Sequence, residues 1–126
     1  MPRVLVVDDE EQIRSMLQKI LTRAGHDVCT ASNAQAAIDI CERPARFDLV
    51  ISDVIMPGVD GHHLARWLAV RCPDSRVILM SAFDPGCDEC PYLDNCQRLT
   101  KPFSAKDVVR LVSDALSRPA RALRVD

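Results

Sequence analysis

Short apolar segments alternate along the chain with longer segments of helical periodicity. Residues 4–7, 49–52 and 77–80 are rich in Val, Ile and Leu, which predicts buried strands. Two weaker segments, residues 26–31 and 99–100, complete a set of five expected strands. The regular return of these segments predicts a sheet whose strands are joined by helices.

Between the strands, apolar residues recur every three or four positions, the spacing of one face of an amphipathic helix. This pattern predicts helices over residues 13–21, 36–40, 64–70 and 108–116. Gly25 is expected to end the first helix, and Pro44 the second. Asn33 and Ser104 stand where caps are expected before the second and the last helix.

Strands that alternate with helices favour an α/β fold, a doubly wound five-stranded parallel sheet covered on both faces. One interval breaks the pattern, because residues 83–97 carry no helical periodicity. Pro85, Gly86 and Pro91 argue against a full-length helix there. We therefore expect a shortened or irregular fourth helix, with a turn or two at most.

Composition is that of a globular protein: 126 residues, 48% hydrophobic and 27% charged, with a net charge of −2. The chain lacks the clustered positive charge of a general nucleic-acid-binding protein, so direct nucleic-acid binding is not expected. No apolar run approaches the roughly 20 residues of a membrane span, and the N-terminus does not resemble a signal peptide. The prediction is a cytoplasmic protein with no membrane partner.

Polar residues with related chemistry follow the predicted strands. Asp8 and Asp9 follow the first strand, Asp53 the third, Ser81 the fourth and Lys101 the fifth. In a parallel sheet these ends share the edge at which such folds bind ligands. Taken singly, an Asp after a strand is most often a turn residue or a helix cap. Together, the residues indicate a divalent metal, a phosphorylatable aspartate and a lysine that contacts the phosphoryl group.

The order of the motifs resembles the receiver domain of two-component response regulators. The resemblance covers residues 3–118 and rests on Asp8-Asp9, Asp53, Met56-Pro57 with Asp60-Gly61, Ser81-Ala82 and Lys101-Pro102-Phe103. It implies the flavodoxin-like strand order 2-1-3-4-5. It also implies a receiver domain over residues 1–118, followed by a short tail or linker stub over residues 119–126.

The resemblance implies that Asp53 accepts a phosphoryl group from a sensor histidine kinase or phosphotransfer protein. Asp8, Asp9, Asp53 and the backbone carbonyl of Ile55 would bind Mg²⁺, which prefers oxygen ligands. The chain would therefore be a phosphoprotein, a switch in a phosphorelay. It would catalyse only its own phosphorylation and slow dephosphorylation, and would not be an enzyme with a separate substrate.

Further positions follow from the same resemblance. Lys101 would pair with a phosphoryl oxygen, Ser81 would move to hydrogen-bond it, and Pro102 would follow a cis peptide bond. Phosphorylation would alter the surface formed by residues 83–118, which an unknown output protein or a second copy of the chain would read. A homodimer is thus left open.

The chain departs from the family at three positions. Arg98 stands where members often carry an aromatic switch residue, so that switch is in question. Ile55 and Phe83 occupy the two positions that tune dephosphorylation, and both are apolar. Because apolar side chains shield a phosphoryl group and cannot orient water, we expect slow hydrolysis.

The interval between Ser81 and Lys101 holds a candidate thiol cluster, Cys87, Cys90 and Cys96. Thiolates at this spacing can bind Zn²⁺ or an iron–sulfur cluster. The plainer interpretation is reduced cysteines, or a disulfide formed in air. The alternative function is therefore a metal- or redox-responsive interaction module on a receiver fold.

A third possibility, a hydrolase of the haloacid dehalogenase type, also uses an aspartyl phosphate. That class would require an Asp-x-Asp motif after the first strand, where this chain has adjacent Asp8-Asp9. It would also usually need a cap domain, for which 126 residues leave no room.

Overall fold

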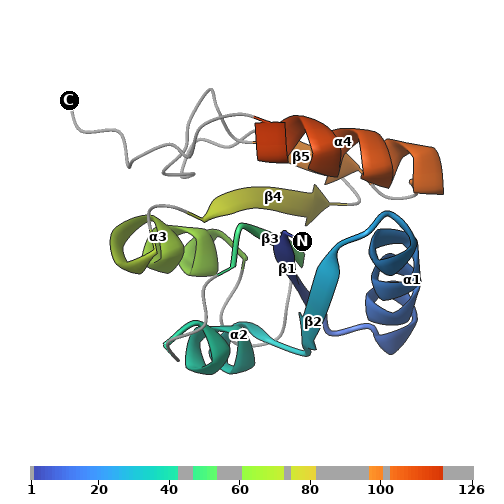
Figure 1. Ribbon diagram of the computed structural model, residues 1–126. Helices are drawn as coiled ribbons and strands as arrows, with labels where there is room; N and C mark the ends of the chain where they lie inside the picture. Colours follow the sequence, from blue (N-terminus) through green and yellow to red (C-terminus); the bar gives the residue numbers. More distant parts are fainter. Residues whose placement is uncertain are drawn as a thin grey trace.

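The computed structural model describes residues 2–42, 47–53, 61–72, 75–81, 97–100 and 103–117. Strands and helices alternate through most of the described chain, as the hydrophobic pattern predicted (Figure 1). The elements are β1 (Arg3–Val7), α1 (Glu11–Arg23), β2 (Asp27–Ala31), α2 (Ala34–Cys41), β3 (Leu49–Asp53), α3 (Gly61–Arg71), β4 (Arg76–Ser81), β5 (Gln97–Thr100) and α4 (Ala105–Ser117). No helix among them is both long enough and apolar enough to cross a membrane.

The five strands form one sheet in the order β2-β1-β3-β4-β5, and every neighbouring pair is parallel. This confirms the doubly wound, flavodoxin-like fold. The chain places β1 in the interior of the sheet, with β2 on one side and β3 on the other. The order therefore reverses at β1, and such switch points are where open α/β sheets bind ligands.

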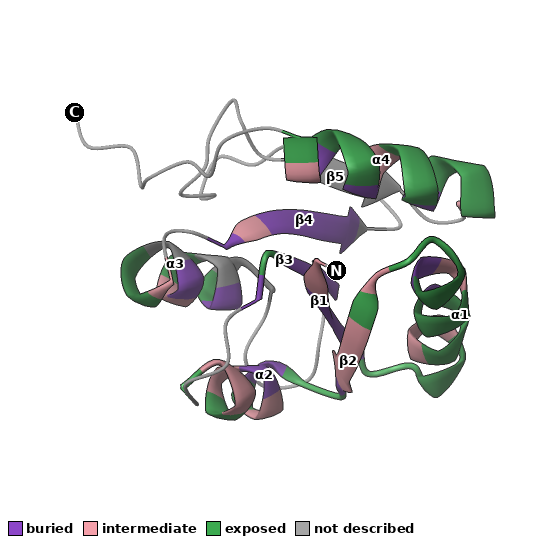
Figure 2. Ribbon diagram, in the orientation of Figure 1, coloured by how far each residue is buried: buried purple, intermediate pink, exposed green. Residues whose placement is uncertain are grey.

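Alternate residues of each strand face opposite sides of the sheet, and each side has its own core. On one side, Leu5 and Val7 of β1 belong to a buried cluster with residues of α2 and α3. On the other side, Val4 and Val6 belong to a cluster with residues of α1 and α4. Figure 1 shows the resulting three layers, with the sheet between two pairs of helices, and Figure 2 shows that β4 is largely buried while β2 is largely intermediate or exposed. Burial on both faces explains why β1, β3 and β4 carry continuous apolar runs.

Local signals end and begin the helices as expected. Gly25 has φ of 95° and follows α1, where its N–H donates to the carbonyl of Thr22 while the N–H of His26 donates to that of Leu21. These two bonds form a Schellman motif, which needs a residue that tolerates positive φ. Asn33 caps α2, since its side-chain oxygen accepts a 2.7 Å hydrogen bond from the N–H of Ala36.

Some boundaries differ from the predicted ones. The strands β3 and β4 include Asp53 and Ser81 as their last residues, rather than ending before them. The helix α2 ends at Cys41, ahead of Pro44, and β5 begins at Gln97, inside the interval expected to be irregular. The expected irregular fourth helix falls on residues 83–96, which lie outside the described residues.

Candidate functional site

Strand register brings two of the predicted acidic residues level at the carboxyl edge of the sheet. In the pairing of β1 with β3, Val7 lies opposite Ser52. Asp8 and Asp53 are the next residue of each segment, so both stand one step beyond that pair. In the pairing of β3 with β4, Asp53 lies opposite Met80, so that Ser81 follows one residue further along. The sequence prediction that these residues share one edge is therefore confirmed for their backbone positions.

Both level aspartates are buried. Asp8 is 0% exposed and Asp53 is 7% exposed, whereas Asp9 is exposed. A buried carboxylate is costly unless it is paired, hydrogen-bonded or bound to a metal. Two such carboxylates at the ends of adjacent strands mark a site that favours a cation.

The backbone and the carboxylate of Asp8 are both held by hydrogen bonds. Its N–H donates to the carbonyl of Ala31, the last residue of β2, at 3.2 Å. Its Oδ1 accepts from the N–H of Glu10 at 2.9 Å. Its carbonyl accepts from Nη1 of Arg14 on α1 at 2.6 Å. The turn between β1 and α1 is therefore held by Ala31 of β2 and by Arg14 of α1.

Asp53 ends the strand β3, between the two central neighbours β1 and β4. Its carbonyl accepts a buried 3.0 Å hydrogen bond from the hydroxyl of Ser52. The position is rigidly defined, because β3 is buried along its whole length and pairs on both sides. A carboxylate on a strand end is held more precisely than one on a loop.

The turn after β1 offers a set of oxygen ligands. Asp8, Asp9 and Glu10 each present a carboxylate oxygen, and these atoms lie within 4.8 Å of one another. An all-oxygen set of carboxylates suits a hard cation such as Mg²⁺, which binds one or two carboxylates and keeps several waters. The donor chemistry therefore fits the expected metal. Glu10 was not among the predicted ligands, although its place directly after Asp8-Asp9 could have indicated it.

The remaining predicted positions are only partly described. Ser81 is the last residue of β4, opposite Thr100 of β5, and only its backbone is described. Since Thr100 immediately precedes Lys101, the lysine follows the neighbouring strand in the sequence. Outside the described residues lie Ile55, Phe83, Cys87, Cys90, Cys96, Lys101 and Pro102, so their predicted roles stay predictions.

The sequence matches a known family over most of its length. The model of the response regulator receiver domain matches residues 4–113. The response regulator protein FleR of Pseudomonas aeruginosa is 37% identical over 113 residues, which are 88% of this chain and 24% of FleR. The alkaline phosphatase synthesis transcriptional regulatory protein PhoP of Bacillus subtilis is 35% identical over 118 residues, 92% of this chain and 49% of PhoP.

Solved structures give the same result for the fold. The chemotaxis protein CheY4 of Vibrio cholerae has a TM-score of 0.83 at 27% identity, covering 91% of this chain and 98% of that one. The response regulator protein TrrA of Thermotoga maritima, solved in complex with Mg²⁺-BeF, has a TM-score of 0.81 at 30% identity, with coverage of 91% and 99%.

The chain belongs to the response regulator receiver domain family, whose members are phospho-accepting switches of two-component signalling. It spans about a quarter of FleR and about half of PhoP. Receiver domains are signalling domains, and the relatives named here are regulators. The comparisons supply no support for the alternative metal- or redox-responsive module.

Proposed function

We propose that Asp53 is the phosphoryl acceptor of this receiver domain, and that a sensor histidine kinase or phosphotransfer protein is the donor. The observation that carries the proposal is the register of β1 and β3, which sets the buried carboxylates of Asp8 and Asp53 at neighbouring strand ends. Of the two, Asp53 stands on the central strand. Asp8 lies in the acidic turn after β1, whose other members suit cation binding.

Asp8 and Asp9 of the acidic turn would hold Mg²⁺ together with Asp53 at the end of β3 and the backbone carbonyl of Ile55. A bound Mg²⁺ would neutralise part of the charge that accumulates when a carboxylate meets a phosphoryl group. Glu10 extends the same set of oxygen ligands. The Mg²⁺ bound to the relative TrrA supports this assignment.

The transfer step exchanges one bond to phosphorus for another. A carboxylate oxygen of Asp53 forms the new P–O bond while the P–N bond to the donor's imidazole breaks. The leaving nitrogen keeps the electron pair of the broken bond. By the family resemblance, Lys101 would pair with a phosphoryl oxygen, and Ser81 would hydrogen-bond to it as the first step of the switch. Pro102, after a cis peptide bond, would set the position of Lys101.

The readout would be the surface formed by residues 83–118 of a receiver domain spanning residues 1–118. Its described part includes α4, which packs on the same face of the sheet as α1. An output protein or a second copy of the chain would bind there. Residues 119–126 would be a short tail or linker stub.

Phosphorylation by a small donor tests the acceptor directly. The 126-residue chain would be incubated with acetyl phosphate and Mg²⁺, and its intact mass followed. We expect one added phosphoryl group on the wild type, none on Asp53→Asn, and release of the group by hydroxylamine, which cleaves acyl phosphates. Asp39→Asn is the matched control, since Asp39 lies exposed on α2 and accepts a hydrogen bond from Gln35.

Two results would overturn the proposal. The first is a wild-type chain that gains no phosphoryl group at saturating donor and Mg²⁺. The second is an Asp53→Asn variant that gains the group as fast as Asp39→Asn does, because the acceptor would then be another residue.

A further inference from the structure

Arg14 links α1 to the acidic turn. It is the fourth residue of α1 and is half-buried. Its guanidinium Nη1 donates a 2.6 Å hydrogen bond to the main-chain carbonyl of Asp8. Charged donors make shorter and stronger hydrogen bonds than neutral ones, and this bond is a short one.

A second bond from the same residue reaches the other end of the turn. The backbone N–H of Arg14 donates to the carbonyl of Glu10 at 3.2 Å. Arg14 therefore contacts Asp8 through its side chain and Glu10 through its backbone, and Asp9 lies between these two residues. The exposed carboxylate of Asp9 is carried by a backbone segment that Arg14 holds on both sides.

The hydrogen bond to Asp8 also supports the carboxylate of that residue. The peptide unit whose carbonyl Arg14 holds joins Asp8 to Asp9, so the bond restrains the rotation that would carry the two carboxylates apart. The Glu10 N–H donates to Oδ1 of Asp8 only while the turn keeps this shape. Loss of the Arg14 side chain would thus release the Asp8 end of a three-residue set whose oxygens lie within 4.8 Å, while the backbone bond to Glu10 would remain.

We propose that Arg14 is a positioning residue for the cation site, holding the turn so that Asp8 and Asp9 present their carboxylates together. This inference rests on the proposed function of the acidic turn as the Mg²⁺ site. Arg14 acts through the backbone of Asp8 rather than by touching the cation. Its role is geometric, because its side-chain hydrogen bond is to a neutral main-chain carbonyl.

Replacements that separate hydrogen bonding from charge test the proposal. Arg14→Ala removes both, Arg14→Gln keeps an N–H donor without the charge, and Arg14→Lys keeps a charged donor. The control is Arg23→Ala, at the exposed last residue of the same helix. Mg²⁺ affinity would be measured by calorimetry, and circular dichroism would confirm that each variant is folded.

We expect Arg14→Ala to weaken Mg²⁺ binding about tenfold, the effect typical of residues that orient metal ligands. Arg14→Lys and Arg14→Gln should recover part of the loss, and Arg23→Ala should bind as the wild type does. If charge mattered more than geometry, Arg14→Gln and Arg14→Ala would both bind Mg²⁺ more tightly. Either that result or an unchanged affinity in Arg14→Ala would overturn the proposal.

A measurement without metal separates this inference from the proposed function. Amide hydrogen exchange of Glu10, whose N–H is bonded to Asp8, reports the shape of the turn directly. We expect faster exchange in Arg14→Ala than in Arg23→Ala. If the wild type binds no Mg²⁺, the proposed function fails. The exchange rate of the Glu10 amide would still test whether Arg14 holds the turn. Equal exchange rates in the two variants would show that Arg14 does not hold the turn.

Discussion

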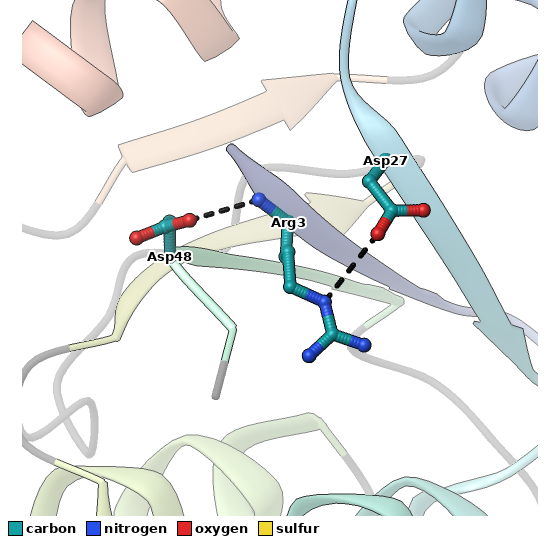
Figure 3. Close-up of polar contacts among 3 residues, drawn as sticks. All are labelled: Arg3, Asp27 and Asp48. Atoms are coloured by element: carbon teal, nitrogen blue, oxygen red, sulfur yellow. Dashed lines mark hydrogen bonds and ion pairs between the residues drawn. The ribbon is translucent and has the colours of Figure 1, made fainter. Parts of the chain in front are cut away.

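Arg3 and Asp48 are joined by two reciprocal hydrogen bonds at the amino edge of the sheet, opposite the acidic site. The N–H of Arg3 donates to Oδ2 of Asp48, and the N–H of Asp48 donates to the carbonyl of Arg3, both at 2.8 Å. The carbonyl of Asp48 also accepts from the N–H of Arg76 at 3.0 Å. Figure 3 shows Arg3 between Asp48 and Asp27, the latter in a 3.5 Å ion pair with its Nε. One aspartate thus connects the starts of β1, β3 and β4.

Removing the Asp48 side chain should destabilise the fold more than removing the ion pair beside it. Asp48→Ala loses the acceptor for the Arg3 N–H, so we expect a loss of about 1 kcal/mol in the free energy of unfolding. Asp27→Asn removes only an exposed ion pair and should cost less than about 0.5 kcal/mol. Urea unfolding followed by circular dichroism measures both. Equal losses would mean that the Asp48 side chain stabilises this edge no more than the ion pair does.

The start of α4 depends on Ser104. Its hydroxyl accepts from the N–H of Asp107, and its own N–H donates to Oδ2 of Asp107, both at 3.1 Å. This reciprocal pair is a capping box with Asp in the third position. We expect Ser104→Ala to lower the free energy of unfolding by about 1 kcal/mol. Ser113→Ala, on the exposed face of the same helix, should not; a similar loss there would refute a capping effect.

The same cap should be sensitive to acid. Hydrogen bonds from Ser104, first from its backbone N–H and then from its side chain, hold the pKa of Asp107 below the ordinary value of 3.8. Because the folded pKa is lowered, the stabilisation is present above the unfolded value and is lost as pH falls through the folded one. Below pH 3.8, stability should therefore fall more steeply in wild type than in Asp107→Asn. Parallel curves of unfolding free energy against pH would contradict this.

Cys41, at the end of α2, should be an unreactive thiol. Burial, and to a lesser extent the nearby Cys72, raise its pKa from 9.0 to about 11. Since thiolate is the reactive form, iodoacetamide should modify Cys41 slowly near neutral pH and faster as pH rises. Mass spectrometry of digests would give the rates. In unfolded protein the three described cysteines should react alike, and an equally fast Cys41 in the native chain would contradict the raised pKa.

The raised thiol pKa also predicts a loss of stability in alkali. A group whose folded pKa is raised holds its proton longer in the native state, so stability is lost as pH rises from 9.0 toward about 11. The unfolding free energy of Cys41→Ala should fall less over this range than that of the wild type. No difference between the two slopes would mean that Cys41 titrates alike in both states.

Among these substitutions, the largest loss in the free energy of unfolding is expected in the hydrophobic core, at Leu79 of β4. Leu79 is 1% exposed and belongs to the cluster between the sheet and α2 with α3. We expect Leu79→Ala to lower the free energy of unfolding by about 2–5 kcal/mol, through lost burial and the cavity left behind. Val70, on α3, is 67% exposed, so Val70→Ala should stay within about 0.5 kcal/mol. Denaturant unfolding of the two variants measures the contrast, and a small effect at Leu79 would require the site to collapse around the cavity.

The features that the sequence predicted correctly depend on residues that are close together in the chain. Gly25, Asn33 and Ser104 end or begin helices through hydrogen bonds that span only a few residues, so each signal is contained in its own segment. The apolar strands and the acids that follow them are local patterns too. Their alternation with helices was enough to predict a parallel sheet and a shared edge for Asp8 and Asp53.

Relations between distant segments were decided only by the tertiary structure. The register that sets Val7 opposite Ser52 depends on packing both sheet faces at once, which no single segment specifies. Asp48 binds Arg3 across 45 positions in the chain, and nothing near either residue indicates the other. The bond from Arg14 to Asp8 spans six positions, yet it forms only because the turn after β1 directs that carbonyl toward α1. The sequence thus determined which chemical groups reach the carboxyl edge of the sheet. Tertiary packing decided which other residues hold those groups in place.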